Sequence, residues 1–249
     1  MRQFITAAAL AATLFLAPGA SLGVTQDQPV QTATVQAQAP TPEVSPAAAY
    51  GLPAGHDHDH ESGLAPGQDA AQFRAWLGRS SANRAAIDAF QARLTAEGVA
   101  GVVPLWQLVR TSSSWRECGA EPFEVAPADK WDHIVETLRF VRDKVKPAVG
   151  EVEALSAYRN EHLNACSAGA PRSAHRQFFA LDLTPVNAAV TRSAMIQSVC
   201  RAHAHDGRSY DAGLGFYSGR RFHVDSNGYR KWGPDGRGAS SPCAAVRQA

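Results

Sequence analysis

The stretch that decides the fold is SAHRQFFALD at residues 173–182, read together with FHVD at residues 222–225. The apolar run before Asp182 is typical of a strand that enters a core, and such a strand would hold this carboxylate in a fixed place facing His175. His223 lies in a second short, strand-like segment. Two imidazoles and one carboxylate can bind a catalytic zinc ion and leave a fourth position open for water. We therefore predict a zinc site made by His175, Asp182 and His223.

The composition favours one folded domain with a tail. The chain has 249 residues, and its hydrophobic content of 45% is sufficient for an ordinary globular core. The formal net charge of +1 gives no reason to expect a nucleic-acid partner or binding to an acidic membrane surface. We place the domain at residues 70–249 and expect a monomer.

Residues 1–23 are typical of a secretory signal peptide. Arg2 provides a short positive start, residues 4–16 are apolar and uncharged, and small residues follow up to Gly23. The apolar run is shorter than the roughly 20 residues that a membrane-spanning helix needs. We expect cleavage near residues 20–23, no stable membrane insertion afterwards, and a periplasmic or secreted protein. An uncleaved N-terminal anchor is the alternative.

Residues 24–69 are predicted to be a disordered linker, because they are rich in Gln, Ala, Pro, Thr and Gly and have few large apolar side chains. Within this linker, residues 56–61 read HDHDHE. Alternating imidazoles and carboxylates can chelate divalent metals, so the tract is either a zinc-capturing segment or a solvated polar stretch that binds metal incidentally.

Four cysteines in an exported chain suggest two disulfide bonds, for which three pairings are possible. The favoured pairing joins Cys118 to Cys166 and Cys200 to Cys243. The first bond would tie the segment before the central helix to the loop before the predicted site. The second would attach the C-terminal tail to a helix.

Hydrophobic periodicity predicts helices near residues 73–77, over 83–97, from about 129 or 131 to 145, and from about 188 or 191 to 205. Strands are expected at residues 151–158, 178–183, 213–217 and 221–225, and the last two would be joined by a tight turn at Ser218 and Gly219. Residues 160–166 are predicted to be a loop, and Pro147 to follow the end of its helix. Helices followed by short strands favour an α+β fold with a small, mainly antiparallel sheet flanked by helices.

Three of these motifs together resemble those of a known enzyme family. SAYR at residues 156–159, SAHRQFFALD and FHVD are similar to the motif set of the zinc D-alanyl-D-alanine carboxypeptidases and their peptidoglycan endopeptidase relatives. The resemblance covers about residues 120–232 and implies a Hedgehog/DD-peptidase fold. It also implies that His175, Asp182 and His223 bind one zinc ion and that Arg159 stabilises charge on the scissile carbonyl. The implied substrates are peptidoglycan stem or cross-link peptides, cut next to a D-amino acid.

The chain departs from this family where a general base is expected. Many relatives have an acidic residue three positions before the last histidine ligand, and here that residue is Arg220. Asp225 lies two residues beyond His223 on the same face of a strand, so we expect it to act as the base or to support a ligand. Asp206 and Asp211 are weaker candidates for the base. The alternative function is a non-catalytic, zinc-containing cell-wall-binding domain, and the sequence leaves open whether the enzyme would be a carboxypeptidase or an endopeptidase.

Overall fold

The computed structural model of the chain describes residues 64–246. The predicted signal peptide at 1–23, nearly all of the predicted linker and the 56–61 tract lie outside the described residues. The folded part begins slightly before the predicted boundary at residue 70. Gln68 is fully buried, and its Nε2 donates to the carbonyl of Pro122 at 2.9 Å, so the end of the predicted linker is packed against the domain.

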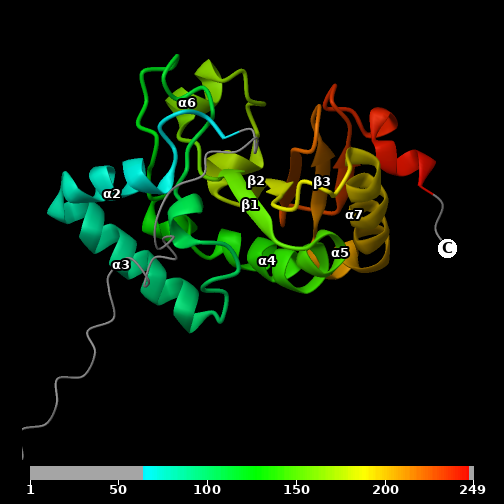
Figure 1. Ribbon diagram of the computed structural model, residues 1–249, viewed down its shortest axis with the longest axis horizontal. Helices are drawn as coiled ribbons and strands as arrows, with labels where there is room; N and C mark the ends of the chain where they lie inside the picture. The colour runs from blue at the N-terminus through cyan, green and yellow to red at the C-terminus, as the bar shows by residue number, and fades with distance from the viewer. Residues whose placement is uncertain (1–63, 247–249) are drawn as a thin grey trace, which may run out of the picture. The chain divides into compact units, whose positions relative to one another are not determined.

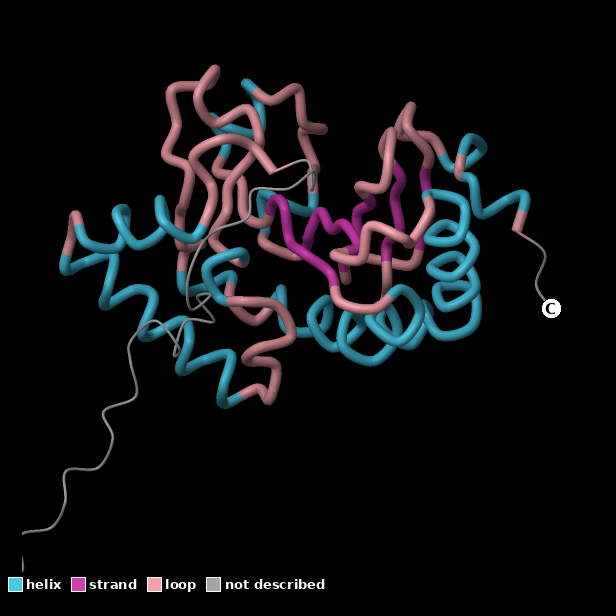
Figure 2. The backbone as a smooth tube through the Cα atoms, viewed as in Figure 1, coloured by secondary structure: helices cyan, strands magenta, loops and turns pink. Residues whose placement is uncertain are grey.

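A five-stranded sheet, whose strands are magenta in Figure 2, carries Asp182 and His223. Its strands are β1 (Val152–Ser156), β2 (Ala180–Pro185), β3 (Gly213–Phe216), β4 (Phe222–Asp225) and β5 (Arg230–Trp232), in the order β1-β2-β4-β3-β5. The first three pairings in this order are antiparallel, and β3 with β5 is parallel. The small, mainly antiparallel sheet and the α+β class are therefore confirmed. Strand β5, which has only three residues, was not predicted from the sequence.

Helices α4 (His133–Phe140), α5 (Lys146–Val149) and α7 (Arg192–Asp206) lie together beside the sheet (Figure 1). Helix α4 contacts both β2 and β4, and its buried face includes Ile134 and Leu138. A π-helical turn over Val141–Val145 continues α4 directly into α5. The expected helix end before Pro147 was wrong. Pro147 lies in the first turn of α5, directly after the π-helical turn, and the helix continues past it to Val149.

Helices α2 (Ala70–Gly78) and α3 (Ser81–Ala96) form the N-terminal part of the described domain. Both begin at side-chain caps, Asp69 for α2 and Ser80 for α3. The ring of Phe73 packs edge-on against Phe123 at 5.5 Å between centroids, which joins α2 to the segment after Cys118. Both predicted N-terminal helices are present.

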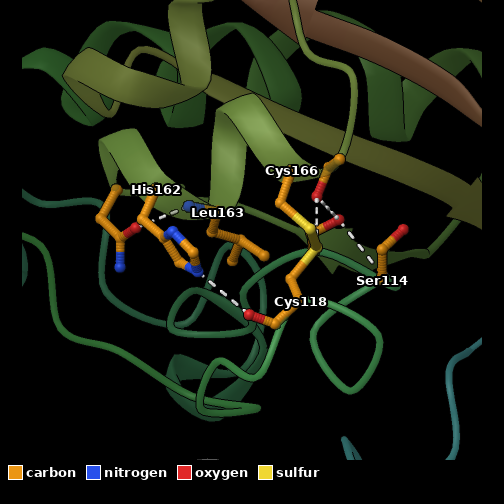
Figure 3. The surroundings of a disulfide bond; sticks show 8 residues. Ser114, Cys118, His162, Leu163 and Cys166 are labelled. Atoms are coloured by element: carbon orange, nitrogen blue, oxygen red, sulfur yellow. Dashed lines mark hydrogen bonds between the residues drawn. A yellow bond between two sulfur atoms is a disulfide. The ribbon is translucent and has the colours of Figure 1, made fainter.

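Helix α6 (Glu161–Cys166) occupies a segment that the sequence analysis predicted to be a loop. The side chain of Asn160 accepts from the backbone N–H of Leu163 and caps this short helix. The far end is fixed by the Cys118–Cys166 disulfide, and the His162 Nε2 makes a 3.0 Å hydrogen bond with the carbonyl of Cys118 (Figure 3). Non-local bonds thus stabilise a helix too short to be recognised from periodicity.

The second disulfide joins Cys200 in α7 to Cys243 in the C-terminal tail. Both favoured pairings are therefore confirmed, and two disulfides are compatible with an extracellular or periplasmic protein. Across residues 64–246, none of the helices combines the length and the apolar character needed to cross a membrane.

Candidate metal centre

Three elements bring His175, Asp182 and His223 together, and we call these residues the metal triad. His175 lies in a 3₁₀ turn over Ala174–Gln177, and Asp182 and His223 are opposite each other in the register of β2 and β4. Phe178 adopts a left-handed conformation at φ 61° and ends the turn, so β2 begins at Ala180 and not at the predicted residue 178. This reversal of the chain places His175 beside β2, the strand that carries Asp182.

The triad has the geometry of a metal site. His175 Nε2 lies 3.2 Å from His223 Nδ1 and 3.3 Å from Asp182 Oδ1, and the last two atoms are 3.1 Å apart. Zinc binds nitrogen and oxygen ligands at about 2.0–2.1 Å, so two ligand atoms of a tetrahedral site are about 3.3 Å apart. The three residues are at most 4% exposed. The triad is therefore a buried group that can hold a metal ion.

Each histidine is oriented by a hydrogen bond from its other ring nitrogen. His175 Nδ1 donates to the carbonyl of Ala157 at 2.5 Å, and His223 Nε2 donates to Asp225 Oδ2 at 2.8 Å. These bonds select tautomers in which the remaining nitrogens direct lone pairs toward the centre. Such outer partners are typical of histidines that bind metals.

The carboxylate of Asp182 is surrounded by donors. Its Oδ2 accepts from Arg221 Nη2 at 2.7 Å and from Arg159 Nη2 at 3.3 Å, while the Tyr217 hydroxyl donates to Oδ1 at 3.0 Å. Ser156 of the SAYR motif is paired with Asp182 across β1 and β2. Because the arginines contact Oδ2, the carboxylate would bind a metal through Oδ1.

The environment keeps two of the three triad residues, His175 and Asp182, in the protonation state that binds a metal. Burial and the positive charge of Arg159 lower the pKa of His175 to about 4, so this ring is neutral at ordinary pH. Burial alone would raise the pKa of Asp182, but the positive charge of Arg221 helps to hold it well below its usual range. Burial works against a charged His223, yet its hydrogen bonds with Asp182 and Asp225 raise its pKa overall. His223 is thus the ligand for which protons compete most strongly with a metal.

Asp225 does not face the centre. Its Oδ2 accepts from His223 Nε2, and both carboxylate oxygens accept from the guanidinium of Arg230 at 2.8 and 2.9 Å. Burial opposes its charged form, but His223 and Arg230 lower the pKa of Asp225 to about 2. A carboxylate so engaged, on the far side of the His223 ring, is poorly suited to take a proton at the metal. The structure favours the expected supporting role over the expected base.

The other expected acid positions lie outside the triad's hydrogen bonds. Arg220 donates to the backbone carbonyls of Asn187 and Val190, and Asp206 pairs with Lys144 and with His205. Within residues 64–246, Asp225 is the sole carboxylate outside the triad that hydrogen-bonds to a triad residue.

Tyr217 and Arg221 were not predicted from the sequence as residues of the site. Trp232 lies 5.3 Å from the His223 ring and 5.3 Å from the Tyr217 ring. The alternation Arg221, His223, Asp225 along one strand face was a signal that could have found the arginine. Arg221 is partly exposed, with 26% of its side chain accessible. Two surface hollows of about 570 and 600 Å³ lie elsewhere, and no triad residue lines either of them.

Comparisons of the chain with protein families, with curated proteins and with solved structures found no match.

Proposed function

We propose that the protein is an exported zinc-dependent peptidase that cuts peptidoglycan stem or cross-link peptides next to a D-amino acid. The observation that carries this proposal is the triangle of His175 Nε2, Asp182 Oδ1 and His223 Nδ1, with edges of 3.1–3.3 Å. Further support comes from the motif resemblance, because SAYR, SAHRQFFALD and FHVD meet around Asp182. On the same grounds we propose a Hedgehog/DD-peptidase fold.

The residues around the triad suit amide hydrolysis. A zinc ion held by the triad would lower the pKa of a bound water toward about 7 and make it a nucleophile. Arg159 is nearly buried beside Asp182, where its guanidinium can stabilise negative charge on a carbonyl oxygen. Tyr217 supplies a hydroxyl donor in the same place. Asp225 would keep His223 in the tautomer that binds metal.

The test is incubation of the purified protein with peptidoglycan sacculi, with and without zinc, followed by separation of the released fragments by mass. We expect new peptide fragments with zinc and none from His175→Ala. His205→Ala is the matched control, because this histidine side chain is 85% exposed and, within residues 64–246, pairs only with its neighbour Asp206. No fragments from the zinc-loaded protein, or undiminished release by His175→Ala, would refute the proposal.

A non-catalytic, zinc-containing wall-binding domain is the second candidate. The observation that favours it is the engagement of Asp225, which leaves the centre without a free carboxylate base among residues 64–246. This candidate predicts that the protein sediments with sacculi without releasing fragments. Binding that persists after zinc removal and in Asp225→Ala would favour it over the peptidase.

A further inference from the structure

A surface hollow of about 600 Å³ lies between α3 and the segment that follows Cys118, and no triad residue lines it. Residues from α3, from the stretch 119–125 and from the start of α6 line it together. The lining is partly apolar, with Trp76, Ala86 and Phe123, and partly polar, with Asn83, Glu124 and His162. A volume of this size, with apolar walls and a few polar groups, is typical of a small-ligand site.

Non-local bonds hold the walls of this hollow in place. The Cys118–Cys166 disulfide joins the segment after Cys118 to α6, and His162 Nε2 bonds to the carbonyl of Cys118 at 3.0 Å (Figure 3). On the side of the N-terminal helices, Asn83 Nδ2 donates to the carbonyl of Trp76 at 3.0 Å and ties α3 to α2. The hollow is therefore formed before any ligand arrives, as most ligand sites are.

Glu124 brings a negative charge to the hollow that no cation of the described residues pairs with. Its side chain is half-buried, and burial raises its pKa. Its Oε2 accepts from Asn160 Nδ2 at 2.8 Å, and its Oε1 has no partner within residues 64–246. Lys130 acts on this charge only from a distance, because its ammonium donates to the carbonyl of Arg176 at 2.9 Å. A partly desolvated charge without a partner is costly, so the hollow is complementary to a cation.

The shape and chemistry of the lining favour an ammonium group on an aliphatic chain. A guanidinium pairs best with both oxygens of a carboxylate, and Asn160 already occupies Oε2 of Glu124. An ammonium is a compact charge that needs only one oxygen, and Oε1 is available. The Oδ1 of Asn83 is a further acceptor, because its amide nitrogen is the atom that bonds to Trp76. Apolar walls suit the methylene groups that carry an ammonium in a lysine side chain.

We propose that this hollow is a second ligand site, which binds the side-chain ammonium of a lysine-like residue in a peptide through Glu124. The methylene chain would lie against Trp76 and Phe123, and the ammonium would donate to Glu124 Oε1. This inference goes beyond the proposed function and does not depend on the metal centre.

The experiment compares acetyl-Ala-Lys-Ala-amide with the same peptide carrying norleucine in place of lysine. Both probes are blocked at their ends, and the norleucine side chain has the same four carbons without the amine. Binding is measured by titration calorimetry on the full chain without added zinc. We expect the lysine peptide to bind at least about tenfold more tightly than the norleucine peptide. An arginine peptide is expected to bind more weakly than the lysine peptide.

Two variants test the assignment to this hollow. Glu124→Gln keeps an oxygen for Asn160 but removes the charge, so it should bind the lysine and norleucine peptides equally. Ala86→Phe places a ring in the hollow from an exposed position of α3 and should weaken binding of the lysine peptide. Glu161→Gln is the matched control, because this carboxylate side chain is 86% exposed, pairs with Arg176 and does not line the hollow. It should bind both peptides as the unmodified protein does.

Equal binding of the lysine and norleucine peptides by the unmodified protein overturns the inference, as does the absence of measurable binding. A preference for lysine that survives in Glu124→Gln, or that is lost in Glu161→Gln, overturns the role of Glu124. Tighter binding of the arginine peptide overturns the choice of an ammonium. If Glu124→Gln does not fold, undiminished binding of the lysine peptide by Ala86→Phe still refutes the site, and weakened binding supports it.

Discussion

Replacement of Asp225 with asparagine tests whether this carboxylate positions His223 or takes part in the chemistry. Asp225 is 1% exposed and accepts four hydrogen bonds, from His223 Nε2, from two nitrogens of Arg230 and from the backbone N–H of Asn227, all between 2.8 and 2.9 Å. In Asp225→Asn, the amide oxygen can still accept from the backbone N–H of Asn227 and from one Arg230 nitrogen. The new amide NH₂ would face the other Arg230 nitrogen and His223 Nε2–H, and donors do not bond to donors.

The consequence for the metal centre follows from the tautomer of His223. To bond with the new NH₂, the ring must move its proton from Nε2 to Nδ1, which then points a hydrogen at the metal position. Loss of such an outer partner lowers metal affinity by about 10–100-fold, which corresponds to about 1.4–2.7 kcal/mol. Loss of the charged hydrogen bonds also destabilises the metal-free protein, by about 1.5–3 kcal/mol.

Zinc affinity is measured by competition with a chromophoric chelator, and stability by denaturant unfolding of the metal-free protein. Asp235→Asn is the control, because this carboxylate is exposed and, in the described part of the chain, bonds only to Arg237 and Ser240 of the C-terminal tail. If Asp225→Asn binds zinc as tightly as the unmodified protein while fragment release from sacculi is lost, the positioning argument is refuted. Asp225 would then be part of the reaction.

Three other predictions concern the metal, the sheet and pH. Zinc at a free concentration 100 times its Kd should stabilise the folded protein by about 2.7 kcal/mol in thermal or denaturant unfolding, and a stabilisation that persists in His175→Ala would contradict the triad. Gly215→Ala should destabilise by about 1–3 kcal/mol, because its Cβ would lie 1.9 Å from the Trp232 ring, whereas Gly78→Ala meets no atom within 4 Å and should show no such loss. Burial lowers the pKa of His203, so the unfolded state binds its proton first, and stability should fall as the pH drops below the unfolded value of about 6.5. In His203→Gln, the denaturant midpoint should fall less steeply as the pH drops below about 6.5. A fall as steep as that of the unmodified protein would refute the assignment of this pH dependence to His203.

Local signals in the sequence predicted much of the fold. Amphipathic periodicity located α3 and α7, and the turn at Ser218 and Gly219 predicted the hairpin of β3 and β4. These features depend on residues close together in the chain, and local sequence patterns record such contacts directly. Helix α6 and strand β5 were missed because six and three residues carry too little periodicity. The Cys118–Cys166 disulfide and the Asn160 cap stabilise α6 instead, and the parallel pairing with β3 stabilises β5.

The candidate site likewise has features that the sequence predicts and features that only the tertiary structure shows. The sequence by itself determined which residues are available as ligands, namely His175, Asp182 and His223. Few residue types bind zinc, and the motifs that contain these residues can be recognised from the sequence alone. Only the tertiary structure decided that Asp182 Oδ1 faces the two histidines, that Asp225 is paired with Arg230, and that Arg221 lies beside Arg159. The physical reason is strand register. Pairing Asp182 with His223 across some forty residues of chain depends on the packing of the whole sheet, which local sequence patterns do not record.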